Sequence, residues 1–330
     1  MSKIVRAIDL GWGFTKFTVQ SPSGEMGFGM IPSLAPRHSG VDLGGVLLGR
    51  RKTVVVTVQG TSYEVGEDSG DIDPSDNTRN LNSDSFVFAD QYKAVFLGAL
   101  HAMATPSIDL LVLGLPLMNM RLSDDVRKMA IGKHEVEGRI FEVRDVVVLG
   151  QPVGGLQYCL GLSDVEGFKE LHDEVSLIID PGYLTLDFLV ANGSRPIDSR
   201  SGAHTGGVSK VLRTMADSIS TRYGLKFDNL SVIDKALRKN KLKINGEIVP
   251  INPHIIDAKS VIEGSVAYVK NLVGSGADID NIILIGGGAF IYQKTLQQAY
   301  PRHKILTAPN SQFANVMGFY SAGCRLIEMS

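Results

Sequence analysis

The sequence has few of the residues that would place it among disulfide-rich, zinc-binding or strongly basic proteins. Its 330 residues include two cysteines, Cys159 and Cys324, and their wide separation excludes a disulfide framework and a zinc site. The net charge of −2 gives no overall signal for direct binding to nucleic acid. No apolar run reaches the ~18 residues of a membrane span, and neither end resembles a signal peptide or a basic amphipathic anchor. We therefore expect a cytoplasmic protein with no membrane partner.

What is present favours an α/β protein with a substantial core. Hydrophobic residues make up 44% of the chain, and the length suggests roughly two domains. Helical spacing predicts helices over 91–104 and 207–224, one long helix over 253–273, and a closing helix over 311–329. Ser123 is the expected N-cap of another helix. Strand patterns alternate with these helices, so the expected class is α/β.

The most informative pattern is an internal repeat at an offset of 171 residues. AIDLGWGFTKFTV (7–19) aligns without a gap with IIDPGYLTLDFLV (178–190). Each copy reads as a strand, a turn with an aspartate and a glycine, and a second strand. Two such units half a chain apart predict two similar domains that face each other.

The turn in each copy has a specific chemistry. Glycines let the backbone bend so that its N–H groups point outward and form an anion-binding nest. A carboxylate beside such a nest would repel a phosphate unless a cation lies between them, and Mg²⁺ is the usual one. The sequence therefore predicts that two hairpins grip a polyphosphate, with Asp9 and Asp180 holding Mg²⁺ through water and Lys16 adding a point charge.

Two other nucleotide-binding motifs are absent from the sequence. In GGVLLGRRKT (44–53), Arg50 and Arg51 stand where a P-loop needs lysine and a hydroxyl residue. GWGFTK (11–16) and GGGAFI (286–291) both lack the third glycine of the dinucleotide-binding fingerprint. The sequence therefore favours neither a P-loop nor a dinucleotide-binding domain.

The ordered set of motifs resembles the actin-like ATPase superfamily. AIDLGWGFTK resembles its first phosphate motif, IIDPGYLTLD the second, and IILIGGGA (282–289) the adenosine motif. VLGQP (148–152) is similar to the segment that carries the water-orienting residue, and ANVMGFYSAG (314–323) to the second connecting helix. The resemblance implies an actin-like fold, in which two related ribonuclease-H-like domains flank a nucleotide cleft.

The resemblance also implies domain boundaries. Domain I would span 1–160, with a small subdomain at about 24–90, and would be completed by the C-terminal helix 312–330. Domain II would span 161–311, with a small subdomain at about 225–255.

Within the superfamily the chain resembles the ParM/StbA-type plasmid-segregation proteins. The features that carry this likeness are the short length, the D-P-G-x-x-T-x-D turn, the FANVMGFY ending and IPSLAP (31–36). Two departures bear on the second turn: Pro181 removes one backbone N–H donor, and Leu184 replaces a small residue.

The resemblance assigns site residues by position. Gln151 would orient the attacking water, and Asp180 would be catalytic as well as metal-holding. The phosphate-binding set is Gly11, Trp12, Gly13, Thr15, Lys16, Gly182, Tyr183 and Thr185. The adenosine-binding set is Gly206, Gly207, Lys259, Glu263, Gly286, Gly287, Gly288 and Ala289.

Several of these residues have a plain structural alternative. Lys259 and Glu263 also fit an i,i+4 surface ion pair. Thr15 and Thr185 could be ordinary strand threonines. Trp12 could fill a core or pack between domains, and Asp187 could orient the second hairpin or lie at the surface.

The implied function is a filament-forming ATPase that polymerises with Mg·ATP, with GTP as another candidate nucleotide. Its partners would be further copies of itself, through surfaces in 24–85 and 225–255, and a ParR-type adaptor that binds plasmid centromere DNA. The alternatives are a sugar-type kinase of the same fold, or a cell-shape or division relative. A kinase would need a carboxylate base near the γ-phosphate.

Overall fold

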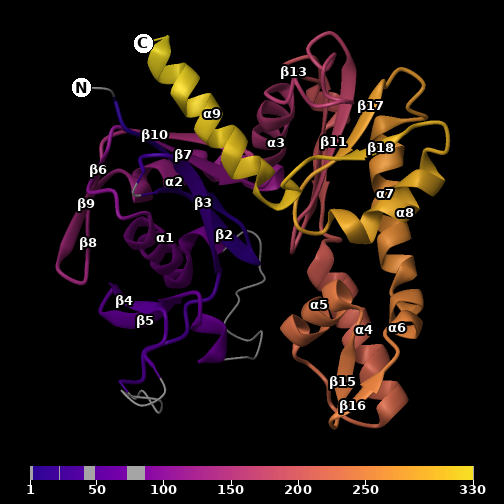
Figure 1. Ribbon diagram of the computed structural model, residues 1–330, viewed down its shortest axis with the longest axis horizontal. Coiled ribbons are helices and arrows are strands. Elements are labelled where there is room, and N and C mark those ends of the chain that lie inside the picture. Colours follow the sequence, from indigo (N-terminus) through magenta and orange to yellow (C-terminus); the bar gives the residue numbers. More distant parts are fainter. Residues whose placement is uncertain (1–2, 22, 41–48, 73–85, 330) are drawn as a thin grey trace.

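The structure is a computed structural model that describes residues 3–21, 23–40, 49–72 and 86–329. Two α/β halves lie side by side, each built around its own sheet (Figure 1). The last helix, α9 (Ala314–Glu328), returns from the second half to lie over the sheet of the first. Among the described residues, no helix is long and apolar enough to cross a membrane.

The first half contains a five-stranded mixed sheet. Its strands, in spatial order, are β10 (Val146–Gly150), β7 (Leu110–Leu115), β1 (Val5–Leu10), β2 (Phe14–Gln20) and β3 (Met26–Pro32). β1, β7 and β10 are parallel, whereas β2 and β3 run antiparallel to their neighbours. β1 and β7 are buried along their whole length, which explains their unbroken apolar runs.

The second half repeats this arrangement. Its main strands, in spatial order, are β13 (Arg195–Pro196), β12 (Leu186–Asn192), β11 (Val175–Pro181), β17 (Asn281–Leu284) and β18 (Ile305–Thr307), and β14 (Gly202–His204) also pairs with β12. β11, β17 and β18 are parallel, and β12 is antiparallel to β11.

The two hairpins pair in the same register. Ile8 faces Phe17 and Asp9 faces Lys16 in the first half, while Ile179 faces Phe188 and Asp180 faces Asp187 in the second. Every one of these pairs is related to its counterpart by the offset of the sequence repeat. The repeat thus marks two equivalent hairpins.

Helices cover the sheets. They are α1 (Asp90–Met103), α2 (Ser123–Ala130), α3 (Gln151–Leu160), α4 (Val208–Tyr223), α5 (Leu230–Lys239), α6 (Asn252–Asp257), α7 (Lys259–Val273), α8 (Ala289–Ala299) and α9. The helices expected over 91–104 and 207–224 are thereby confirmed to within a few residues. At 311–329 a short 3₁₀ turn, Ser311–Phe313, precedes α9.

Two helix predictions are wrong in detail. The single helix expected over 253–273 is interrupted at buried Ala258, which separates α6 from α7. Helix α6 packs against α4. There the Ser218 hydroxyl donates to Asp257 and pairs with His254. Ser123 is not an N-cap, since the 3₁₀ turn Leu117–Leu122 runs directly into α2 and gives Ser123 helical dihedral angles.

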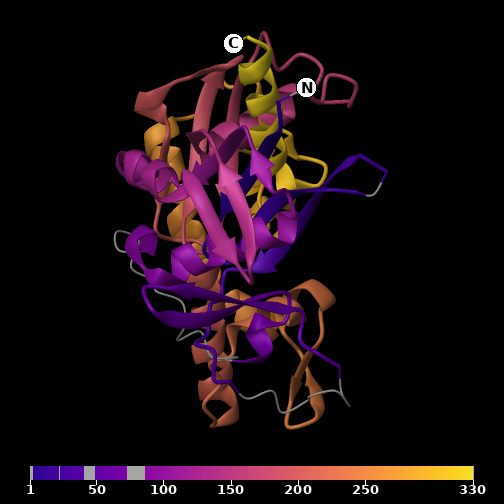
Figure 2. The same cartoon turned by 90° about the vertical axis from the view of Figure 1, so that its left-hand side faces the viewer.

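Smaller elements extend from each half. In the first half β4 (Thr53–Val58) pairs with β5 (Thr61–Gly66), and β8 (Gly132–Val136) pairs with β9 (Arg139–Val143), which also pairs with β6 (Ser107–Ile108). In the second half β15 (Leu242–Ile244) pairs with β16 (Glu247–Val249). The β4–β5 and β15–β16 hairpins lie on the same side of the two main sheets (Figures 1 and 2).

Strand β3 lies within the range 24–90 that was expected to form a small subdomain. It is the edge strand of the main sheet, because it pairs with β2 over seven residues from Met26 to Pro32. Residues 41–48 and 73–85 of that range lie outside the described residues.

Candidate functional site

A cleft separates the two halves at the ends of the equivalent strands β1 and β11. It holds about 870 Å³ of space, part of it open to solvent. The turns of the two hairpins face each other here, and a Cβ on Gly13 would lie 3.0 Å from Cβ of Tyr183. Both turns therefore border the same space, as the repeat predicts.

The wall of the cleft comes from seven segments of the chain. The lining residues are Asp9, Gly11–Phe14, Lys16, Gln151, Asp180–Tyr183, Thr185, Val208, Leu212, Leu230, Ser231, Asp234, Arg238, Gly286–Gly288, Gln312 and Asn315.

Asp9 is the last residue but one of β1 and is 1% exposed. Its Oδ2 lies 3.1 Å from Nζ of Lys16, the residue opposite it on β2. Its Oδ1 accepts a hydrogen bond of 2.7 Å from Nε2 of Gln151, the first residue of α3. The carboxylate, the ammonium and the amide, which the sequence placed in two separate motifs, thus form one connected group.

Asp180 is the equivalent residue on β11 and is also buried. Nδ2 of Asn315, on α9, donates a hydrogen bond of 2.6 Å to its Oδ2. Burial raises the pKa of Asp180 to about 6, and the negative charge of Asp9 adds to the shift, while Asn315 and Lys16 oppose it. A carboxylate in this state gains from any cation that enters the cleft.

Asp187 lies opposite Asp180 across the hairpin and is 1% exposed, so it is not a surface carboxylate. Its two oxygens accept hydrogen bonds from the Thr185 hydroxyl, at 2.5 Å, and from the backbone N–H of Leu117 in the first half, at 2.8 Å. Burial raises the pKa of Asp187 to about 7. The bond from Leu117 ties the second hairpin to the first half, and the bond from Thr185 lies within the hairpin.

The charges at this end of the cleft are suited to a divalent cation. Asp9, Asp180 and Asp187 bring three carboxyl groups together, and Lys16 is the cation placed beside them. Among the described residues, no group of three or more His, Cys, Asp or Glu is arranged to coordinate a metal directly. The residues present therefore fit Mg²⁺ held largely by water and by a phosphate ligand, with Asp9 and Asp180 as outer partners.

The glycine turn after β17 borders the other end of the cleft. Gly286 has φ of +75°, and a Cβ there would lie 2.0 Å from Oδ1 of Asp180. A Cβ on Gly288 would lie 2.6 Å from the carbonyl oxygen of Pro181. A Cβ on Gly287 would meet nothing closer than 3.8 Å, at Cγ of Gln312. Two of the glycines are thus required by packing, and Gly287 faces open space where a flat ring could approach the backbone.

Helix α5 forms the facing wall and was missed by sequence reasoning. Nε of Arg238 lies 3.1 Å from Oδ2 of Asp234, and its NH2 group donates to the carbonyl of Gly287 at 3.3 Å. The guanidinium also lies 5.1 Å from the ring centroid of Phe290 on α8. Oδ1 of Asp234 is buried and has no hydrogen-bond partner, so the cleft contains a free acceptor. No motif marks α5, because its contribution depends on tertiary packing alone.

Asn315 was also missed, although it lies in the segment 314–323 that resembles the second connecting helix. A Cβ on Gly318 would lie 1.8 Å from the carbonyl oxygen of Gly154, so α9 and α3 pack backbone to backbone. This close approach is what brings Asn315, one turn earlier on α9, to Asp180.

Six of the predicted site residues lie off the cleft. Thr15 is buried, and its hydroxyl pairs with Ser33 at 2.8 Å. Lys259 and Glu263 form an exposed i,i+4 ion pair at 2.9 Å. Gly206 and Gly207 support the turn before α4, and Ala289 borders an adjoining hollow that shares Gly286 and Gly287 with the cleft. These positions leave Thr15, Lys259 and Glu263 with the plain structural roles described above.

Trp12 has the core-filling role considered for it and also borders the cleft. It lines the cleft, and its ring stacks on Phe86 with centroids 4.0 Å apart. It thereby joins the first turn to the core that α1 covers.

Comparison with known proteins agrees with this geometry. Residues 7–154 match the family model of the N-terminal domain of actin-like proteins, and residues 178–298 match that of the C-terminal domain of archaeal MreB-like actin homologues. The matches begin two residues before Asp9 and two before Asp180, and together they cover most of the chain. None of the curated protein sequences matches it.

Solved structures show the same fold over the full length. A ParM filament from Clostridium botulinum superimposes with a TM-score of 0.77 at 19% identity, covering 98% of this chain and 100% of that one. An archaeal actin homologue in complex with ADP superimposes with a TM-score of 0.74 at 19% identity, covering 98% and 99%. The actin-like protein Alp7A gives 0.75 at 15% identity, covering 100% and 98%. With two equivalent hairpins on either side of one cleft and a family match in each half, this chain belongs to the actin-like superfamily.

Proposed function

We propose that this protein is a filament-forming ATPase that binds Mg·ATP in the cleft and hydrolyses it after polymerisation. The observation that carries the proposal is the position of Asp9 and Asp180, two buried carboxylates at equivalent places in the two hairpins, which both line the cleft. The domain boundaries given by the resemblance, 1–160 with 312–330 and 161–311, are part of the proposal.

The cleft residues divide into three roles. The backbone around Gly11–Gly13 and Gly182–Tyr183 would hold the phosphates, with Lys16 as a point charge. Asp9 and Asp180 would hold Mg²⁺ through water, and the ion would offset charge on the β- and γ-phosphates. The purine would lie between Gly287 and α5.

Gln151 would position the attacking water. Its Nε2 is committed to Asp9, which leaves its carbonyl oxygen free to accept a hydrogen bond from water in the cleft. A neutral amide can orient water without removing its proton. We expect Gln151→Ala to slow hydrolysis by roughly 10²-fold while nucleotide affinity is retained, and loss of affinity would contradict the assignment.

The structural neighbours include ParM proteins, one of them in a filament, and this supports self-association of the present chain. We further propose plasmid segregation as the cellular role, with a ParR-type adaptor connecting the filament to centromere DNA. The near-neutral net charge of −2 suits contact with DNA through an adaptor.

Right-angle light scattering of the purified protein, with phosphate release followed in the same sample, tests this function. A rise in scattering on addition of Mg·ATP, followed by decay as phosphate appears, is the expected result. Parallel runs with Mg·GTP would show the nucleotide preference. ATP consumption only in the presence of a sugar acceptor, with no rise in scattering, would instead indicate a kinase.

A further inference from the structure

The two helices that cross between the halves repeat one short pattern. Gln151 is the first residue of α3 and lies three residues before Gly154. Asn315 is the second residue of α9 and lies three residues before Gly318. Positions 151 and 315, like 154 and 318, are 164 residues apart. A side chain on Gly318 would collide with the carbonyl group of Gly154, so the two helices touch where the pattern repeats.

The two amides hold equivalent carboxylates. Nε2 of Gln151 donates to Oδ1 of Asp9 at 2.7 Å, and Nδ2 of Asn315 donates to Oδ2 of Asp180 at 2.6 Å. Helix α3 follows β10, the third parallel strand counted from β1, and α9 comes after β18, the third counted from β11. The equivalence of the halves therefore extends from the hairpins to an amide on each connecting helix.

An ungapped alignment does not reveal this second match. The chain separation is 142 residues between Gln151 and Asp9 but 135 between Asn315 and Asp180. The connections within the two halves thus differ in length, although the same hydrogen bond closes each of them.

The side chain of Asn315 has a fixed environment. It is 6% exposed and borders the cleft. Its Nδ2 faces the carboxylate, because an amide oxygen in that place would be repelled. Its Oδ1 is buried against α3, where a Cβ on Gly155 would lie 3.2 Å away, and it has no hydrogen-bond partner among the described residues. The bond to Asp180 is thus the polar contact that sets how this amide lies.

A neutral donor suits a carboxylate that must receive a metal ion. The amide holds one oxygen of Asp180 without adding a positive charge that would compete with the metal. The other oxygen, Oδ1, lies against Gly286, where a side chain would collide with it. The carboxylate is therefore held in one orientation between α9 and the turn after β17.

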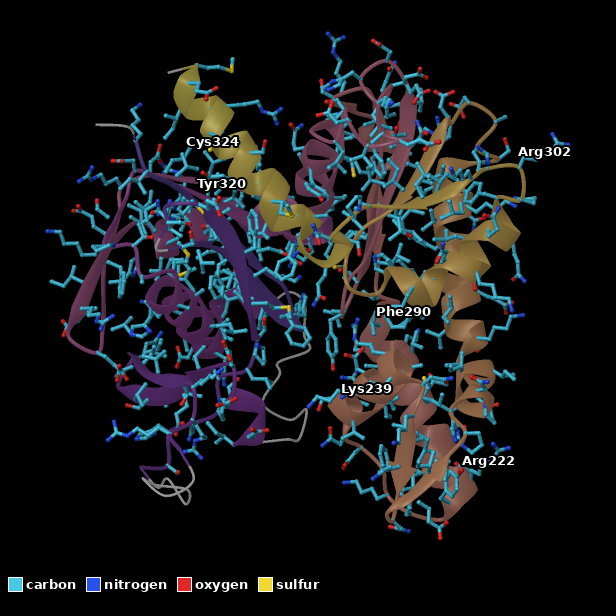
Figure 3. The ribbon with its side chains drawn as sticks, in the orientation of Figure 1. Arg222, Lys239, Phe290, Arg302, Tyr320 and Cys324 are labelled. Atoms are coloured by element: carbon cyan, nitrogen blue, oxygen red, sulfur yellow. The ribbon has the colours of Figure 1, made fainter. Side chains whose placement is uncertain are left out.

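Helix α9 carries this bond from one half to the other. Figure 3 shows Cys324 and Tyr320 on the part of the helix that lies over the first half, and the helix descends from there to the junction of the halves. Asn315 lies in its first turn, and Phe319, one turn further on, is fully buried against the first sheet. The donor to Asp180 is thereby anchored in the opposite half.

We propose that Asn315 is the positioning residue of the second carboxylate and holds Asp180 in the orientation that receives Mg²⁺. The inference rests on the proposed function and deepens it by adding a residue to the Mg²⁺ site. Asn315 acts through Asp180 and has no contact with the nucleotide. It is the counterpart of Gln151, and a movement of one half relative to the other reaches the metal site through its hydrogen bond.

Two substitutions distinguish a donor from a residue that only fills space. Asn315→Leu keeps a side chain branched at Cγ but has no donor. Asn315→Ala leaves room for a water molecule, which can donate to Asp180 in place of the amide. A donor role predicts that the leucine variant is the more impaired. A packing role predicts the reverse order, because alanine leaves a cavity.

Titration with ADP, with and without Mg²⁺, measures the effect without hydrolysis or polymerisation. Trp12 is the single tryptophan of the chain and borders the cleft, so its fluorescence is a suitable signal. We expect Asn315→Leu to raise the Mg²⁺ concentration that half-maximally tightens ADP binding by at least about tenfold. Asn315→Ala should raise it less. ADP affinity in EDTA should keep its wild-type value in both variants, since the amide does not touch the nucleotide.

Hydrolysis of ATP should show the same separation. The leucine variant should need more Mg²⁺ than wild type, but its rate at saturating Mg²⁺ should come within about threefold of the wild-type rate, because excess metal restores occupancy of the site. Arg325→Ala is the matched control. It removes a hydrogen bond from α9 to Gln157 of α3 away from the cleft, and it should change neither measurement.

The contrary outcomes are distinct. Wild-type dependence on Mg²⁺ in the leucine variant would overturn the role of Asn315 and leave the proposed function standing. A larger defect in the alanine variant, or weakened ADP binding in EDTA, would assign Asn315 to packing and also overturn the inference. Nucleotide binding and hydrolysis that do not respond to Mg²⁺ in wild type would overturn both proposals.

Discussion

At the residue scale, the site contains carboxyl groups whose ionised form is disfavoured by burial. Asp180 and Asp187 are buried, their pKa values are raised to about 6 and about 7, and Lys16 is the nearby cation. Buried charge of this kind costs stability unless a ligand compensates it. The cost is consistent with a site built to receive a cation and is typical of functional clefts.

Replacing Asp180 separates its functional role from its effect on stability. Asp180→Asn keeps the side-chain size and an acceptor for Asn315, but it removes the charge. We expect Mg²⁺-dependent ATP hydrolysis to fall by at least about 10²-fold, because interactions of a metal with developing charge are worth several kcal/mol. The ligand-free variant should melt at or above the wild-type temperature. Unchanged turnover would contradict the assignment of the cleft.

The ligand-free protein should also lose stability as the pH rises from about 4 to 7. The folded-state pKa values of Asp180 and Asp187 lie above the ordinary value of 3.8, so the folded state binds more protons across this window. Stability falls with pH wherever the folded state holds the extra protons. Melting temperatures measured in EDTA would show the trend, and Asp180→Asn should flatten it. A melting temperature that rises across the window in both proteins would exclude this origin.

At the scale of helices and strands, the arrangement of the site depends on close contacts of glycine backbones with their neighbours more than on side-chain chemistry. The turn after β17 packs on the second hairpin through Gly286 and Gly288, and α3 packs on α9 through Gly154 and Gly318. These contacts place the adenosine-side turn and Asn315 beside Asp180. The sequence pattern indicated glycine turns, but which glycine faces the ligand follows from the packing of neighbouring strands.

Gly287 is the position where a side chain would meet the ligand and little else. Gly287→Val should weaken nucleotide binding by at least about tenfold, because its methyl groups would project into the cleft. Titration with a fluorescent nucleotide measures this. Gly264→Val is a suitable control, since a Cβ at this exposed helical position meets nothing within 4 Å. Normal affinity in Gly287→Val would remove the purine from this side of the cleft.

At the scale of the whole molecule, the first half is completed by the end of the chain. Val316 and Phe319 of α9 are fully buried against Ala7 and Val112 in the first sheet. Two hydrogen bonds also join the halves across the cleft, from Asn315 to Asp180 and from the Leu117 N–H to Asp187. Opening or closing the cleft must therefore change contacts at both carboxylates.

Removal of α9 should unfold the first half. Each buried apolar side chain contributes about 1.5–3 kcal/mol, so losing several of them removes a large share of a total stability of about 5–15 kcal/mol. A chain that ends at Asn310 should show loss of hydrogen-exchange protection in β1 and β7. A chain that ends at Glu328 loses Met329, which is exposed, and the one residue after it, and should behave as wild type. Retained protection in the shorter chain would mean that the first half folds without α9.

The sequence by itself determined the two hairpins, their shared register and the actin-like fold. Each hairpin is a continuous segment whose alternation, turn glycines and aspartate are local properties, and the offset of 171 residues relates every pair in the register. The tertiary structure decided what surrounds them. Asn315, Asp234 and Arg238 reach the cleft, and Lys259 stays at the surface with Glu263, because helix packing over long sequence separations sets which side chains face the ligand. No local sequence pattern indicates which of these side chains reach the cleft.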